Sequence, residues 1–82
     1  MIIYEVNYEL LKEKRKEKNL TLEDMAKILG LGSRTAYYYK EIGKNAFLDR
    51  DIAIIVPLLG ITFDEFFKKE GSYNQLAGSK YF

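Results

Sequence analysis

The sequence predicts an all-α domain of five short helices, preceded by a short segment with the character of a β-strand. In several segments apolar residues recur every three or four positions, which is the period of a helix with one buried face. Ser, Thr, Asn or Asp stands where each helix should begin, since these side chains accept hydrogen bonds from the amides of a first turn. Glycines stand where three of the helices should end.

These signals set the expected bounds of each helix. The expected helices span residues 8–18, 22–29, 34–42, 50–59 and 63–70, with Asn7, Thr21, Ser33, Asp49 and Thr62 as their N-caps. Asp24 follows Thr21 by three residues and predicts a capping box. We expect Gly30 and Gly32 to supply the positive φ of a sharp reversal, and Pro57 to bend or end the fourth helix.

Residues 1–6, MIIYEV, are β-branched and aromatic for the most part, and they predict a short strand. A single strand needs a partner, and two are open: the C-terminal tail of the same chain, or the same strand of a second chain. The expected organisation is therefore a strand or arm over residues 1–6, a helical domain over residues 7–70, and a tail over residues 71–82.

The composition of the chain excludes several classes of protein. Its 82 residues suffice for one small domain, and they include no cysteine and no histidine. The usual carriers of nucleophilic catalysis and of thiolate metal sites are therefore missing, so we expect neither an enzyme nor a cofactor. No apolar run approaches the about 18 residues of a membrane span, and no basic segment precedes the first apolar residues. We expect a cytoplasmic protein. A net charge of +1 does not by itself indicate nucleic acid.

The apolar faces of the expected helices predict a single core. It comprises Leu11, Leu20, Met25, Ala26, Leu29, Tyr37, Ile52, Ile55, Val56, Leu59, Phe63, Phe66 and Phe67. The fourth helix, which is apolar on nearly every side, should lie at the centre of this core.

The stretch from Leu20 to Gly43 reads as two helices joined by a tight turn, that is, a helix-turn-helix. Together with its flanks it resembles the Cro and phage-repressor class, also called the Xre family, over about residues 10–67. The resemblance is carried by Arg15, Leu20, Thr21 and Ala26, by Ser33, Glu41 and Gly43, and by the ending LGITFDEFF at residues 59–67. It implies a five-helix lambda-repressor-like helix-turn-helix domain and an ion pair between Arg15 and Glu41.

Three positions depart from the pattern of that family. Alignment of Gly43 and the ending with the family requires one extra residue in the turn between the two motif helices, most simply Leu31 or Gly32. Leu22 stands where the family usually has a glutamine that touches DNA phosphate. Lys40 stands where tryptophan or isoleucine is usual, and we expect its ammonium to reach water.

The resemblance also implies a set of DNA-contacting residues. Arg34, Thr35 and Tyr38 would point into the major groove, where arginine suits guanine, threonine offers a methyl group and a hydroxyl, and tyrosine offers a hydroxyl or an apolar face. The residues that would hold phosphates are Thr21, Ser33, Tyr39, Lys44 and Asn45.

Two functions remain open at this stage. The first is a sequence-specific transcriptional regulator of phage or mobile-element type. It would bind a two-fold site on double-stranded DNA as a homodimer, and residues 1–6 and the tail would supply the contacts between the two chains. Arg34 and Lys44 favour it. The second is a protein-interaction module, an antirepressor-like domain that binds another regulatory protein through Tyr38 and Tyr39. The near-neutral charge, Leu22 and the tyrosine run favour this alternative.

Overall fold

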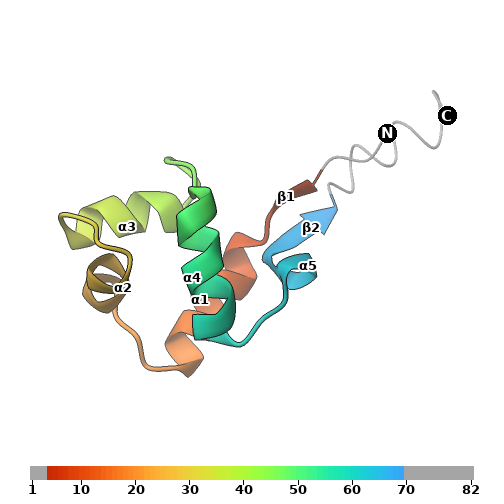
Figure 1. Cartoon of the computed structure of the whole chain (residues 1–82), viewed down its shortest axis with the longest axis horizontal. Coiled ribbons are helices and arrows are strands. Elements are labelled where there is room, and N and C mark those ends of the chain that lie inside the picture. The colour runs from red at the N-terminus through yellow and green to blue at the C-terminus, as the bar shows by residue number, and fades with distance from the viewer. Residues whose placement is uncertain (1–3, 70–82) are drawn as a thin grey trace, which may run out of the picture.

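The computed structural model describes residues 4–69, which form five helices and two short strands (Figure 1). In chain order these are β1 (Tyr4–Val6), α1 (Tyr8–Glu17), α2 (Leu22–Ile28), α3 (Arg34–Glu41), α4 (Asp49–Leu59), α5 (Phe63–Phe66) and β2 (Phe67–Lys69). The expected predominance of helix is confirmed, and a two-stranded sheet is added to it. The predicted tail over residues 71–82 lies outside the described residues. Across residues 4–69 no helix combines the length and apolar character needed to cross a membrane.

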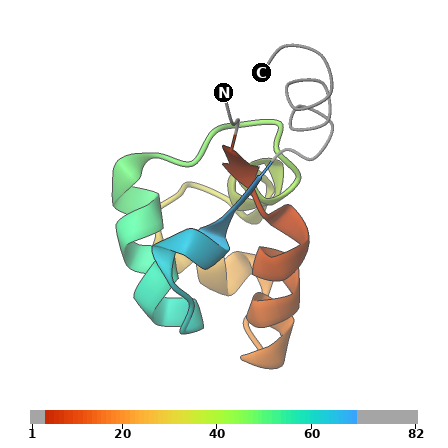
Figure 2. The ribbon, with the colours of Figure 1, turned by 90° about the vertical axis from the view of Figure 1, so that its right-hand side faces the viewer.

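The α2–α3 pair and the sheet occupy opposite ends of the described fold. In Figure 1, α2 and α3 lie together at one end, the β1–β2 sheet lies at the other, and α1 and α4 stand between them. Seen from the sheet end, α1 and α4 flank the molecule and α5 crosses in front of them (Figure 2). Helix α5 also contacts α1, and buried residues from all five helices form one core.

Four of the five predicted N-caps are confirmed. Asn7 Oδ1 accepts a hydrogen bond from the Leu10 amide at 3.3 Å, and Ser33 Oγ accepts one from the Ala36 amide at 3.2 Å. Thr21 and Thr62 each form a capping box, with Asp24 and Glu65 as the reciprocal acceptors. These contacts satisfy amides that no helical carbonyl can reach.

The predicted cap of α4 is wrong. Asp49 is the first helical residue and Leu48 is the N-cap, while the Asp51 carboxylate accepts the Leu48 amide at 2.9 Å. The Asp51 side chain turns inward, and 1% of the residue is exposed. Pro57 lies within α4, which continues to Leu59, because a proline in the last turn removes only one helical hydrogen bond.

One glycine, not two, makes the reversal after α2. Gly30 has φ of +72°, whereas Gly32 has no positive φ, contrary to the prediction. The Leu31 amide donates to the Ala26 carbonyl at 2.7 Å and the Gly30 amide to the Lys27 carbonyl at 3.1 Å. This pair of bonds is a Schellman motif, which needs a left-handed residue at one position only.

The last helix is shorter than predicted, and the segment after it is a strand. Helix α5 ends at Phe66, and β2 pairs with β1 in antiparallel register, with Val6 opposite Phe67. Within the described residues the partner of β1 is therefore its own chain, through residues 67–69, which the sequence predicted as helix. The Asn7 amide donates to the Phe66 carbonyl at 2.8 Å where α5 meets the sheet. Pairing with β1 outweighs the local helix signal, because an isolated β1 would leave its backbone unpaired.

The core agrees with most of the prediction. Its buried apolar members are Leu11, Met25, Ala26, Leu29, Tyr37, Ile55, Val56, Leu59, Ile61 and Phe66, with Leu20, Ile52 and Phe67 partly buried against them. Phe63 is a wrong prediction, since 59% of it is exposed, and Ile61 was missed. A helix of one turn presents only one inward position here. The Phe66 side chain fills it, and the centres of the Phe66 and Phe47 rings lie 5.5 Å apart.

Candidate nucleic-acid interface

Helix α3 has one buried and one exposed face. Tyr37, Lys40 and Glu41 are buried on the inner face. Arg34 and Thr35 in its first turn are exposed, and Tyr38 one turn later is 44% exposed. The structure therefore brings the three predicted base-reading residues together on one solvent-facing surface, supported from behind by the core.

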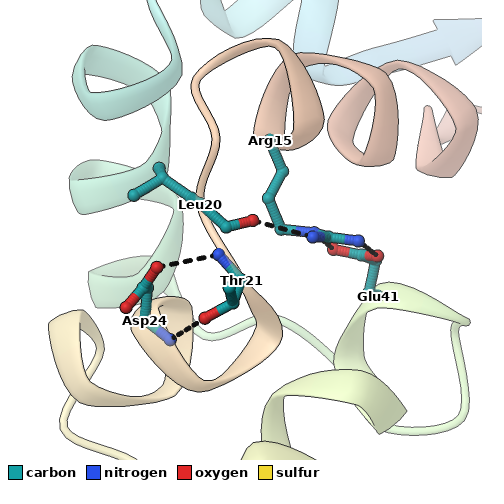
Figure 3. Close-up of polar contacts among 5 residues, drawn as sticks. All are labelled: Arg15, Leu20, Thr21, Asp24 and Glu41. Carbon is teal, nitrogen blue, oxygen red and sulfur yellow. Dashed lines mark hydrogen bonds and ion pairs between the residues drawn. The ribbon is translucent and has the colours of Figure 1, made fainter.

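The predicted ion pair between Arg15 and Glu41 is present and links α1 to α3 (Figure 3). Arg15 Nε donates to Glu41 Oε2 at 2.8 Å and Nη2 to Oε1 at 3.1 Å, which is a bidentate contact. Arg15 Nη1 also donates to the Leu20 carbonyl at 2.8 Å. One buried guanidinium thus fixes the end of α3 against α1 and against the connection to α2.

Lys40 is the clearest disagreement with the sequence prediction. Its ammonium does not reach water, since the residue is 8% exposed and Nζ donates to Asp51 Oδ2 at 2.7 Å and to the Ala46 carbonyl at 2.9 Å. A buried ammonium is tolerated because a carboxylate and a carbonyl replace its hydration. Asp51 was missed as a structural residue. Asp51 is one of two acids in the first turn of α4, and nothing in the sequence marks it as the one that turns inward.

Both ion pairs act on the same end of α3. Glu41 is held from α1 and Lys40 from α4, so two adjacent residues of opposite charge anchor α3 from two sides. Tyr37 lies one turn earlier and is fully buried. Burial raises the pKa of the Tyr37 hydroxyl, and the negative charge of Glu41 raises it further. The orientation of the exposed face of α3 is therefore fixed by buried polar contacts as well as by apolar packing.

The predicted phosphate-holding residues fall into separate places. Tyr39, Lys44 and Asn45 lie together at the end of α3, where the Tyr39 carbonyl accepts the amides of Lys44 and Asn45 at 2.8 and 3.0 Å. The Lys44 ammonium lies 4.2 Å from the centre of the Tyr39 ring, a cation–π contact. Ser33 and Thr21 lie instead at the starts of α3 and α2.

The start of α2 is less suited to an anion than the sequence prediction assumed. The Thr21 amide donates to Asp24 Oδ2 at 2.9 Å, and the Asp24 amide donates to Thr21 Oγ1 at 3.0 Å (Figure 3). The Thr21 amide lowers the pKa of the Asp24 carboxyl, and the Thr21 hydroxyl lowers it further. With Glu23 beside it, this turn carries two carboxylates, which repel a phosphate.

Comparisons with protein-family models, with curated proteins and with solved structures found no match to this chain. Within residues 4–69 no group of three or more potential ligand side chains is arranged to hold a metal ion. The function of the α3 surface must therefore be argued from its own residues.

Proposed function

We propose that the chain is a sequence-specific DNA-binding transcriptional regulator of the phage-repressor type, with a lambda-repressor-like fold in which α2 and α3 are the helix-turn-helix. The observation that carries the proposal is the asymmetry of α3. Its inner face is fixed by the pairs Arg15–Glu41 and Lys40–Asp51, while Arg34, Thr35 and Tyr38 face solvent. A recognition helix needs this combination, because side chains that read base edges must be exposed on a helix of fixed orientation.

Each exposed residue of α3 offers distinct chemistry to the major groove. The Arg34 guanidinium can donate two parallel hydrogen bonds to the O6 and N7 of one guanine. Thr35 offers a methyl group to thymine and a hydroxyl to either purine. Tyr38 offers an apolar ring edge with a terminal hydroxyl. Ser33, Tyr39, Lys44 and Asn45, which border this surface, would hold phosphates and set the orientation of the helix.

A homodimer on a two-fold site is part of the proposal, since one recognition helix spans only a few base pairs. We propose that residues 1–6 and the tail supply the contacts between chains. Strand β1 already pairs with β2 along one edge, so a second chain would use another edge of this small sheet. Sedimentation of the intact chain and of a chain lacking residues 1–3 tests this. Monomers in both cases at micromolar concentration would refute the dimer.

Selection of random duplexes on the purified protein is the primary test, and a palindromic motif is the expected result. On that duplex, Arg34→Ala should weaken binding by about 1 to 3 kcal/mol and relax preference at one base pair. Lys44→Ala should weaken binding to all sequences alike and make the salt slope shallower by about one unit. Lys12→Ala, on the exposed side of α1 and outside the α3 surface, is the control and should change neither the affinity nor the salt slope.

Exposed apolar residues on α3 and at its C-cap favour a second candidate, a protein-interaction module that binds another regulator. Tyr38 and Ile42 are one turn apart and 44% and 50% exposed. Salt separates the two functions, because DNA affinity falls steeply between 50 and 200 mM salt while an apolar protein interface responds little. If selection yields no motif and Tyr38→Ala abolishes association with a protein partner, the repressor proposal is wrong.

A further inference from the structure

A shallow surface hollow lies where the end of α1, the connection to α2 and the start of α3 meet. Its lining includes Arg15, Lys16, Thr21, Leu22 and Arg34. The Arg15 guanidinium is nearly buried and held by Glu41, whereas Lys16 and Arg34 are exposed. Among the described residues Lys16 forms no ion pair, unlike Lys14, whose ammonium lies 3.6 Å from Glu17. Glu23 also lines the hollow, from the α2 side, while Lys16 and Arg34 present two exposed cations that have no ion-pair partner among the described residues, beside the proposed recognition helix.

The start of α2, on the same hollow, is a poor anchor for a phosphate. Leu22 supplies no hydrogen-bond donor from its side chain, and the Thr21 amide is already bound to Asp24. The carboxylates of Glu23 and Asp24 add two negative charges within one turn. A phosphate that approaches this region is therefore repelled from α2 and attracted toward the nearest exposed cations that line the hollow, Lys16 and Arg34.

We infer that Lys16 is a further DNA contact and holds one backbone phosphate in this hollow beside Arg34, in place of the contact expected from Thr21. The inference rests on the proposed DNA-binding function and names a residue that the sequence did not single out. The ligand is a phosphodiester oxygen and the ammonium acts as a point charge, so the contact is independent of base sequence. Arg34 remains available to a base edge, because Lys16 neutralises the phosphate.

The test compares salt dependence among single variants on the selected duplex between 50 and 200 mM salt. Lys16→Gln should make the slope of log K against log salt shallower by about 0.9, so that affinity falls about 3.5-fold less over this range. Lys12→Gln is the matched control, because Lys12 is exposed, lies one turn earlier on α1 and does not line the hollow. Lys16→Arg should keep the wild-type slope. Glu23→Gln, which removes a repelling charge, should tighten binding.

Two results would overturn the inference in distinguishable ways. If the wild type binds the duplex but Lys16→Gln and Lys12→Gln change the slope equally, Lys16 holds no particular phosphate and only this inference fails. If the wild type shows no salt-dependent binding to any duplex, the proposed function fails and the inference fails with it. Thermal unfolding of each variant should match the wild type, since all three substituted side chains are exposed.

Discussion

Removal of the buried ammonium of Lys40 should destabilise the fold more than any surface substitution. Lys40→Met keeps most of the length and apolar surface of the side chain but leaves the Asp51 carboxylate, 1% exposed, without its cation. Loss of one partner from a buried ion pair destabilises by about 3 to 5 kcal/mol. A domain of this size has a free energy of unfolding of roughly 4 to 12 kcal/mol, so the variant should lose much of its stability.

A second substitution isolates the cause of that loss. In Lys40→Met/Asp51→Asn the buried charge is gone, while the asparagine oxygen can still accept the Leu48 amide that Asp51 accepts at 2.9 Å. The Ala46 carbonyl loses its donor but belongs to an exposed residue, so water can replace the ammonium. The double variant should therefore lie within about 2 kcal/mol of the wild type and be more stable than Lys40→Met alone.

Urea unfolding followed by far-ultraviolet circular dichroism at pH 7 measures these differences, with the m value checked for constancy. Lys14→Met is the control, because its pair with Glu17 at 3.6 Å lies at the surface, where 34% of the Lys14 side chain and 58% of the Glu17 side chain are exposed. It should change the unfolding free energy by less than about 0.5 kcal/mol. The reasoning is refuted if Lys40→Met loses less than about 1 kcal/mol, or if the double variant loses as much as the single one.

Three further predictions concern the core, one turn and the response to alkali. Ile55→Ala should lower the unfolding free energy by about 2 to 5 kcal/mol in urea titrations, whereas Phe63→Ala should change it little because that ring is 59% exposed. Gly43→Ala should destabilise by about 1 kcal/mol or more, since φ is +86° and a Cβ would lie 3.1 Å from the Tyr8 ring, while Gly32→Ala meets open space. Tyr37 has a raised pKa in the fold, so it stabilises below the unfolded value near 10 and loses that contribution as pH rises above it. The melting temperature of Tyr37→Phe should therefore fall less between pH 9 and 11 than that of the wild type.

Contacts between near neighbours in the chain were predictable, and those that depend on distant partners were not. Thr21 with Asp24 and Ser33 with Ala36 lie within three residues of each other, so the sequence carries the whole contact. Lys40 and Asp51 come from different helices, and no local pattern marks them as a pair. Their burial follows from how α3 meets α4, which periodicity does not reveal.

The same distinction applies to the ends of the fold and to the candidate interface. Residues 67–69 carry a helix signal, and only β1, about 60 residues earlier in the chain, makes them a strand. The pair Arg15–Glu41 was expected through the resemblance to a family, because no local rule joins residues 26 positions apart. The outward-facing set Arg34, Thr35 and Tyr38 was likewise expected through that resemblance, whereas the hollow beside Lys16 depends on the angle between three elements.

The small β1–β2 ladder has a consequence for how the molecule opens. It joins two segments of three residues each near the ends of the described chain, so only a few hydrogen bonds hold it closed. Amide hydrogens in this ladder should therefore exchange with solvent sooner than those of α4, through local opening. The ladder lies at the opposite end of the fold from α2 and α3 (Figure 1). Opening there would leave both buried ion pairs of α3 closed, so the proposed recognition surface can stay ordered while the chain ends separate.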